Sequence, residues 1–146
     1  MKTSSPLEPE SLSILGVRVH SVTPAQAILL LEGYASSGAP HHVVTVNPEC
    51  CVHAQGSPEF KHALNQADLA LADGVGLLWG ARLLGSRLAA RVTGVDLVDS
   101  LAELAARKGY RLFLLGAGPG VAEAAAAALT RKHPGLAVAG CYSGSP

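Results

Sequence analysis

The sequence predicts an α/β fold, a three-layer Rossmann-like domain with a mostly parallel sheet. Three observations support this prediction. Strand-like apolar segments alternate with segments of helical spacing over residues 13–142. Several of these strands are apolar at every position, which is typical of parallel strands that are covered on both faces. Prolines near the starts and glycines near the ends delimit the helices between them.

Composition limits the class of protein. At 146 residues, the chain is long enough for one domain with a substantial core, and its 49% hydrophobic and 15% charged residues exclude a disordered chain. The formal net charge is zero, so no basic surface indicates a nucleic-acid partner. Cys50, Cys51 and Cys141 form no CxxC pair, which argues against a disulfide framework or a structural zinc site. We therefore expect a reducing, cytoplasmic compartment.

Neither an export signal nor a membrane span is expected. The first twelve residues, MKTSSPLEPESL, contain prolines and acids where a signal peptide needs an apolar run. No apolar segment approaches the roughly 20 residues that cross a bilayer. We expect residues 1–12 to be a flexible lead-in and residues 13–146 to form a single domain.

The elements follow in order along this domain. Residues 13–22 predict a strand or a hairpin arm. Thr23 and Pro24 are typical of a helix start, and Gly38 ends that helix. The remaining strands are expected in residues 41–47, 69–72, 110–116 and 136–142. The remaining helices are expected in residues 48–55, 57–67, 75–85, 93–109 and 119–135.

Small polar residues follow the predicted strands. In a parallel sheet, ligands bind at the carboxyl ends of the strands. Thr45, Asn47, Asp73 and the loop that begins at Gly116 would all lie at that edge. Their shared position predicts a site there more strongly than any one motif does.

Each of these residues also has a structural interpretation. Asp73, in ADGVG, is placed to act as a general base, although Asp-Gly is also a common turn in which the carboxylate binds its own backbone. Thr45 and Asn47, in TVNPE, lie two residues apart and so face the same way on a strand. Both can bind sugar hydroxyls, but Asn47 can equally cap the helix that opens at Pro48.

A glycine-rich turn, LLGAGPG, joins a strand to a helix. Backbone amides at such a helix start attract phosphate oxygens, so Gly116, Gly118 and Gly120 are candidates for binding a diphosphate, with a purely structural tight turn as the alternative. The third position of a GxGxxG fingerprint is Val121, and no Gly-Lys-Ser/Thr follows. Together with the lack of an acid about 20 residues beyond, this disfavours a nicotinamide-dependent oxidoreductase.

Other chemistry has weaker support. Arg91 could pair with a phosphate or with a site carboxylate, or it could be an exposed solubilising residue. The histidines have no HxxxH or HExxH spacing, which favours surface positions over metal ligation. No GxSxG elbow is present, which counts against an α/β-hydrolase.

Four segments taken in order resemble the WecG/TagA/CpsF family of bacterial glycosyltransferases: TVNPE, FKHALNQADLALADGVGLLWGARLLG, RVTGVDLVDSLAELAARKGYRLFLLGAGPGVAEAAAAAL and KHPGLAVAGCYSG. The resemblance runs from about residue 14 to the last residue. It implies transfer of N-acetylmannosamine, or a related hexose, from a UDP-sugar to a polyprenyl-diphosphate-linked sugar. The products of such transfers enter teichoic acid, common antigen, capsule or exopolysaccharide.

The resemblance also implies roles for individual residues. The family's catalytic aspartate corresponds to Asp73, its substrate-positioning threonine and asparagine to Thr45 and Asn47, and its arginine to Arg91. The chemistry implied is inverting and needs no metal ion or other cofactor. Amides of the Gly116–Gly120 turn would help to stabilise the UDP leaving group.

The family's fold continues beyond CYSG with further strands, a Pro-Lys-Gln-Glu-like motif and a basic segment linked to membrane attachment and oligomeric state. The resemblance therefore implies that residues 13–146 form an incomplete domain. Two alternatives stay open: an active glycosyltransferase, and a non-catalytic nucleotide-binding remnant of that family. Peripheral contact with the inner face of the membrane and homo-oligomer formation also remain open.

Overall fold

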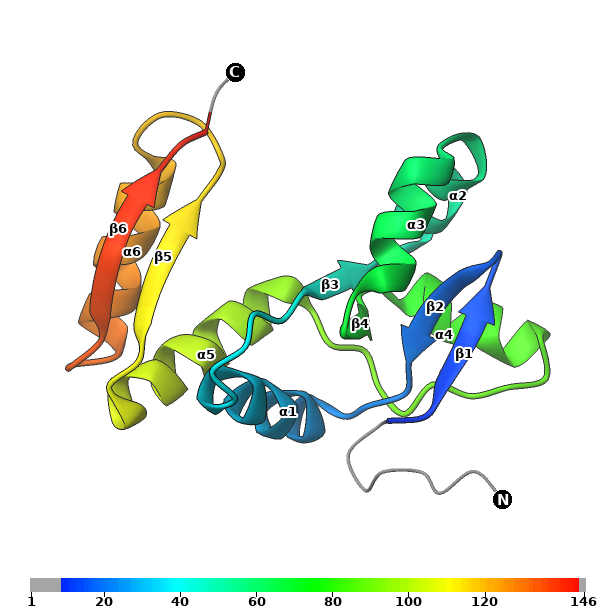
Figure 1. Ribbon diagram of the computed structural model, residues 1–146, viewed down its shortest axis with the longest axis horizontal. Coiled ribbons are helices and arrows are strands. Elements are labelled where there is room, and N and C mark those ends of the chain that lie inside the picture. Colours follow the sequence, from blue (N-terminus) through cyan, green and yellow to red (C-terminus); the bar gives the residue numbers. More distant parts are fainter. Residues whose placement is uncertain (1–8, 145–146) are drawn as a thin grey trace. The chain divides into compact units, whose positions relative to one another are not determined.

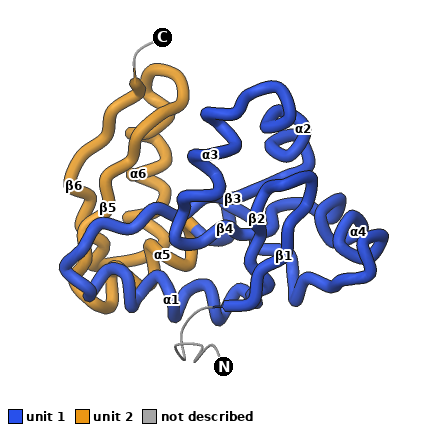
Figure 2. Tube along the Cα trace, turned by 45° about the vertical axis from the view of Figure 1, so that its right-hand side comes forward, with its two compact units in different colours: residues 1–97 blue, residues 98–146 orange. Residues whose placement is uncertain are grey.

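The chain divides into two compact units, Met1–Leu97 and Val98–Pro146, which are described separately below (Figure 2). The computed structural model describes residues 9–144. Most of the expected lead-in, residues 1–8, lies outside this range. Within it the structure is α/β, and every strand pair except one is parallel. The predicted fold class is confirmed.

The first unit is built on a four-stranded sheet with the order β1-β2-β4-β3 (Figure 1). Its strands are β1 (Ser11–Ile14), β2 (Val17–His20), β3 (Val43–Val46) and β4 (Leu69–Ala72). Strands β1 and β2 form an antiparallel hairpin, whereas β4 runs parallel to both β2 and β3. The hairpin is one of the two predicted alternatives, and it begins at Ser11, two residues before the expected start of the domain.

The helices begin where their capping residues predict. In the first unit they are α1 (Pro24–Ser36), α2 (Pro48–Gly56), α3 (Pro58–Gln66) and α4 (Val75–Leu83). Thr23 forms a capping box with Gln26, and Ser57 caps α3 through the amide of Phe60. Since each cap satisfies a backbone amide that the helix leaves unpaired, local sequence fixes the starts of α1 and α3.

Strand β4 is the centre of the core. All four of its residues are buried, as expected for a strand that is apolar at every position. Ala70 and Ala72 pack into a cluster with residues of α2, α3 and α4. Leu69 and Leu71 point to the opposite face and are also fully buried.

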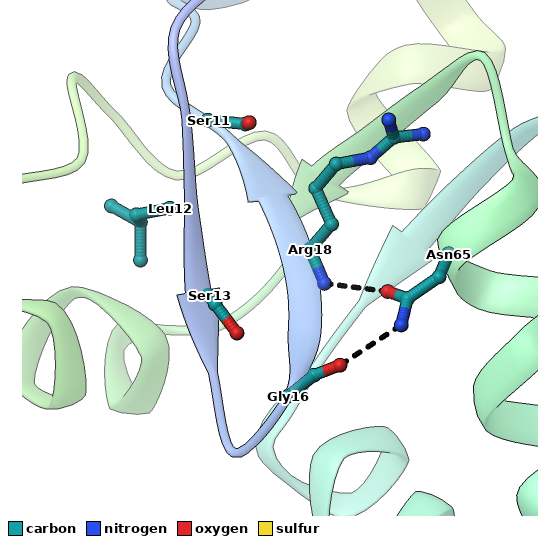
Figure 3. Close-up of a pocket in the computed structure, with 6 residues that line it drawn as sticks. All are labelled: Ser11, Leu12, Ser13, Gly16, Arg18 and Asn65. Atoms are coloured by element: carbon teal, nitrogen blue, oxygen red, sulfur yellow. Dashed lines mark hydrogen bonds between the residues drawn. The ribbon is translucent and has the colours of Figure 1, made fainter.

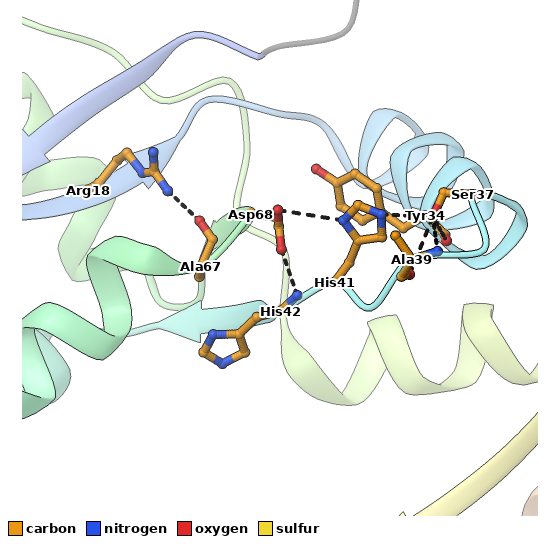
Figure 4. Close-up of polar contacts among 8 residues, drawn as sticks. All are labelled: Arg18, Tyr34, Ser37, Ala39, His41, His42, Ala67 and Asp68. Atoms are coloured by element: carbon orange, nitrogen blue, oxygen red, sulfur yellow. Dashed lines mark hydrogen bonds and ion pairs between the residues drawn. The ribbon is translucent and has the colours of Figure 1, made fainter.

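Polar contacts at the start of β3 and β4 fix their register (Figure 4). The amide of His42 donates to Asp68 Oδ2 at 2.8 Å, and His41 Nδ1 lies 3.5 Å from Asp68 Oδ1. These contacts, above all the bond from the His42 amide, hold the pKa of Asp68 below its usual value. The first pair of the ladder, Val43 with Leu69, follows directly. A shift of one residue would turn every side chain of β3 to the other face.

The second unit contains β5 (Arg111–Leu115), α6 (Val121–Lys132) and β6 (Ala137–Tyr142), together with most of α5 (Gly94–Lys108). Strands β5 and β6 are parallel and form a sheet of their own. Phe113 and Leu115 are exposed, so the prediction that this strand is covered on both faces is wrong in the described chain. The opposite face is packed, because Leu112 and Val138 lie against a small cluster around Ala102.

An ion-pair cluster links α5 to the end of α6 within the second unit. Lys132 Nζ lies 2.7 Å from Asp99 Oδ2, and His133 Nε2 lies 2.9 Å from Asp99 Oδ1. Lys132 and then His133 hold the pKa of Asp99 below its usual value. Throughout residues 9–144, no helix has both the length and the apolar character to cross a bilayer.

Candidate functional site

The two motifs TVNPE and ADGVG meet at the start of α4. Gly76 lies so close to Pro48 that a Cβ atom at Gly76 would be 2.7 Å from Pro48 Cγ. Gly74 has φ +117°, and a Cβ there would lie 3.4 Å from Pro48 Cδ. Glycine at both positions therefore lets the turn after β4 pack against the first residue of α2. This contact places the ends of β3 and β4 next to each other.

Asp73 follows β4 directly and is held by two hydrogen bonds. Its amide donates to the carbonyl oxygen of Val46 at 2.7 Å, which continues the β3–β4 pairing by one step. Its Oδ2 atom accepts from the amide of Gly94, the first residue of α5, at 3.1 Å. Among the described residues, Oδ1 has no hydrogen-bond partner. The carboxylate is thus oriented by one oxygen, while the other can accept a proton or a hydroxyl hydrogen bond.

The Asp-Gly turn alternative for Asp73 predicts a side chain bonded to its own turn. The structure instead shows a bond across 21 residues, to Gly94. Gly94 is not among the predicted site residues. The sequence feature that indicates Gly94 is its position directly after Thr93 at a predicted helix start, because the free backbone amides at such a start attract a carboxylate.

The side chains of Thr45 and Asp73 both lie next to Gly94. A Cβ atom on Gly94 would lie 3.7 Å from Asp73 Oδ2 and 3.7 Å from Thr45 Oγ1. Thr45 pairs with Leu71 in the parallel ladder, and Asp73 lies two residues beyond Leu71, so both side chains belong to one face of the sheet. A hydroxyl and a carboxylate therefore lie together at a half-buried sheet edge, as predicted.

Asn47 caps α2. Its Oδ1 atom accepts from the amide of Cys50 at 2.8 Å, so the structural interpretation of this residue is confirmed. The side-chain carbonyl is occupied by the cap, whereas the NH₂ group makes no hydrogen bond within residues 9–144 and can donate to a ligand. A contact between Asn47 and substrate remains a prediction.

Arg91 lies in the segment that leads into α5. Its neighbour Val92 donates its amide to the carbonyl oxygen of Ala72 at 2.8 Å, which ties this segment to the end of β4. The Arg91 side chain is exposed, and the described residues offer it no ion pair. It lies three residues before Gly94 in the chain, so a charged donor is available near the Asp73 edge.

The glycine turn belongs to the second unit. Gly116 has φ +114° and donates its amide to the carbonyl oxygen of Tyr142 at 2.8 Å, while Gly120 is left-handed at the N-cap of α6. The amide of Val121 donates to the carbonyl oxygen of Gly118 at 3.1 Å, but no side chain caps this helix, so the amides of Ala122 and Glu123 are available to an anion. That Gly116, Gly118 and Gly120 share a site with Asp73 stays a prediction.

A separate hollow of about 360 Å³ lies beside the β1–β2 hairpin (Figure 3). It is lined by Ser11, Leu12, Ser13, Gly16, Arg18 and Asn65, and it contains none of the predicted site residues. Asn65 accepts from the amide of Arg18 and donates to the carbonyl oxygen of Gly16, and the Arg18 guanidinium donates to the carbonyl oxygen of Ala67 (Figures 3 and 4). These bonds attach the hairpin to the end of α3. Asn65 and Arg18 therefore have structural roles here, while Arg18 Nε is buried without a hydrogen-bond partner in the described chain.

Histidines have structural surroundings in the described chain. His20 is buried, and its Nδ1 accepts from the amide of Ala70. His41 stacks on Tyr34 with ring centroids 4.2 Å apart (Figure 4). Over residues 9–144, no three His, Cys, Asp or Glu side chains are grouped so that they could hold a metal ion.

Comparison with known proteins shows the family of the chain. Residues 12–146 match the glycosyl transferase WecG/TagA/CpsF family. A relative from Bacillus spizizenii, named N-acetylglucosaminyldiphosphoundecaprenol N-acetyl-beta-D-mannosaminyltransferase, is 35% identical over 102 residues, which are 70% of this chain and 40% of the relative. A relative of the same name from Staphylococcus aureus is 31% identical over 130 residues, 88% of this chain and 51% of the relative.

The chain thus spans about half the length of these curated relatives. The match nevertheless covers nearly all of its own residues, including TVNPE, ADGVG and the glycine turn. On this evidence the chain belongs to the WecG/TagA/CpsF family of glycosyl transferases.

Proposed function

We propose that the protein transfers N-acetylmannosamine, or a related hexose, from a UDP-sugar to a polyprenyl-diphosphate-linked sugar. The names of the two relatives support the sugar and the lipid-linked acceptor. The observation that carries the proposal is the Asp73 carboxylate, held through Oδ2 by the Gly94 amide and open at Oδ1, beside the Thr45 hydroxyl. Its products would enter a cell-surface polysaccharide.

The proposed reaction is a single inverting displacement. Asp73 Oδ1 takes the proton of the acceptor hydroxyl as the acceptor oxygen attacks the anomeric carbon of the donor. The bond from that carbon to the UDP oxygen breaks, and its electron pair leaves with UDP. A positioned base of this kind contributes about 10²–10⁴-fold to rate. Because the hydrogen bond to Oδ2 fixes the orientation of the carboxylate, Oδ1 faces one direction of approach. A positioned catalytic base requires such a fixed orientation.

The leaving diphosphate needs compensation for its negative charge. We assign this to backbone amides of the Gly116–Gly120 turn and to the Arg91 guanidinium, with no metal ion required. Amides at an uncapped helix start and a fork-shaped cation both suit phosphate oxygens. If this assignment is right, transfer continues unchanged in excess EDTA. A loss that added Mg²⁺ restores would contradict it.

The enzyme must be distinguished from a nucleotide-binding remnant, because this chain spans about half of each relative. The protein is titrated with UDP by calorimetry, and transfer from radiolabelled UDP-N-acetylmannosamine to a lipid-linked N-acetylglucosamine acceptor is measured in parallel. Binding together with transfer supports the enzyme. Binding without transfer supports the remnant, and the absence of both contradicts the proposed donor.

Thr45 is assigned to positioning substrate. Replacing it with Val keeps the branched shape that β3 needs but removes the hydroxyl. We expect Thr45→Val to raise KM for a sugar substrate about tenfold and to leave the unfolding midpoint nearly unchanged. Thr130→Val on α6 is the matched control, since its hydroxyl bonds only to the carbonyl oxygen of Ala126. Equal kinetics in the two variants would remove Thr45 from the site.

A further inference from the structure

Helix α4 is apolar on both of its faces. Leu77 and Ala81 are buried in the core of the first unit. Val75, Trp79 and Leu83, spaced four residues apart, form a second stripe on the outward face, where Trp79 is 63% and Leu83 is 88% exposed. A surface helix normally presents polar side chains to water. The outward stripe, which we call the α4 stripe, has no partner within the described residues.

The chain segment that carries α4 has charge of a single sign. Between Asp73 and Asp96 the chain contains Arg82, Arg87 and Arg91, with no Asp, Glu or Lys. These three arginines are exposed in a protein whose formal net charge is zero. The Arg82 guanidinium lies 5.5 Å from the centroid of the Trp79 ring. The exposed aliphatic and indole groups of the stripe therefore lie beside the Arg82 guanidinium, on a segment whose charged residues are all positive.

The stripe also begins at the candidate site. The N-cap of α4 is Gly74, the residue directly after Asp73. At about 1.5 Å per residue, the eight steps from Val75 to Leu83 cover about 12 Å. An acceptor that hangs from a lipid chain must reach Asp73 from a membrane surface. This last step rests on the proposed function, whereas the apolar stripe and the charge do not.

We propose that the α4 stripe docks on the surface of an anionic lipid bilayer, with the helix lying in the plane of the interface. Leu83 and Val75 would enter the boundary between headgroups and acyl chains, and the Trp79 indole would lie at headgroup level. The guanidinium groups of Arg82 and Arg87 would face lipid phosphates. An anionic bilayer supplies an apolar region for the exposed side chains of the stripe and negative charge for the guanidinium groups.

A second copy of the chain fits the stripe less well. Two α4 stripes packed against each other around a twofold axis would bring like-charged arginines together, and the segment contains no acid to pair with them. Such a dimer would have to pay for this repulsion, whereas a bilayer with anionic lipids gains from the same charges. Self-association is therefore an outcome that the test must be able to detect.

Trp79 is the only tryptophan of the chain, so its fluorescence reports on α4 alone. The protein is titrated with vesicles of equal parts phosphatidylglycerol and phosphatidylcholine, and with vesicles of phosphatidylcholine only. We expect a blue shift, and quenching by brominated acyl chains, with the anionic vesicles. High salt should weaken this binding. No shift with anionic vesicles would overturn the proposal.

Variants assign the binding to α4. Leu83→Ser and Arg82→Gln should each lower the affinity for anionic vesicles, the arginine change by about fivefold, as measured by co-sedimentation. The matched controls are Leu29→Ser on α1, where Leu29 is 67% exposed, and Arg107→Gln on α5. Controls that bind as weakly as the α4 variants would refute the assignment. So would sedimentation velocity showing a dimer that Leu83→Ser dissociates.

Failure of the proposed membrane docking can be distinguished from failure of the proposed function, because the vesicles contain no sugar. Vesicle binding through α4 without sugar transfer keeps the docking surface and removes the enzyme. Transfer to a water-soluble acceptor analogue without vesicle binding keeps the enzyme and removes the docking surface.

Discussion

Replacing Gly76 with Ala tests the contact that joins the two motifs. A methyl group at position 76 would lie 2.7 Å from Pro48 Cγ, well inside van der Waals contact. The Pro48 ring is the first residue of α2 and cannot rotate away as a flexible side chain would. Overpacking of this kind costs about 1–3 kcal/mol. An Ala in a helix gains up to about 1 kcal/mol over Gly, so the two effects oppose each other.

Gly80→Ala separates these effects. It lies on the same helix, and a methyl group there would meet nothing closer than Ile14 Cγ2 at 4.0 Å. Because the helix-propensity gain is common to both variants, their difference isolates the overpacking cost. We expect Gly80→Ala to be more stable than Gly76→Ala by about 1–3 kcal/mol, with Gly80→Ala at or above the parent protein.

The assay is urea unfolding followed through the fluorescence of Trp79, which lies on α4 and so reports on the first unit. In thermal unfolding, each kcal/mol should shift the midpoint by about 2–4 °C. If Gly76→Ala proves as stable as Gly80→Ala, the Pro48 contact does not constrain the start of α4. The structural explanation for the second glycine of ADGVG would then be wrong.

Three further outcomes are expected. Asn47→Ala should cost about 1 kcal/mol in urea unfolding through the lost cap, and Asn47→Ser should recover most of it; if Ser also recovers full transfer, the Asn47 amide does not contact substrate. Since Lys132 and His133 lower the pKa of folded Asp99, their stabilisation is present above its unfolded pKa and is lost as pH falls through the folded pKa. Asp99→Asn should therefore flatten the acid limb of a stability–pH curve, and an unchanged limb would contradict this. Burial raises the pKa of the Cys51 thiol, so its alkylation, followed by mass spectrometry, should be the slowest of the three cysteines, and faster labelling would refute its burial.

Much of the local structure follows from the sequence because its determinants are local. The caps at Thr23, Asn47 and Ser57 act within three residues of each helix start, and all three are present. Strand β4 was predicted at Leu69–Ala72 and lies there, since four successive apolar residues between polar ones fit only a short buried element.

Long-range features were harder to predict. The approach of Gly76 to Pro48 and the bond from Gly94 to Asp73 join residues 28 and 21 positions apart, and no spacing rule relates them. A single sheet was expected, but the described strands form two, with β5 paired only to β6. Strand β5 shows the reason. Its apolar sequence indicates that the strand needs to be buried, but it does not indicate which segment of the chain covers it.

The exposed face of α4 is another case. The sequence VGLLWGARLL has apolar residues all round the helix, and this pattern predicts a buried helix as readily as a surface one. Only the structure distinguishes the inward Leu77 and Ala81 from the outward Trp79 and Leu83. The candidate site was more predictable, because the carboxyl ends of parallel strands lie at one edge of a sheet, and the β3–β4 pairing brings Thr45 and Asp73 to that edge.

The central claim is that Asp73 is the base of sugar transfer, and Asp73→Asn tests it most directly. The amide oxygen of Asn can still accept from Gly94, so folding and UDP binding should be retained. We expect the kcat of transfer from UDP-N-acetylmannosamine to fall by about 10²–10⁴-fold, with the Kd for UDP in calorimetry unchanged. A variant that transfers sugar at the parent rate would contradict the account.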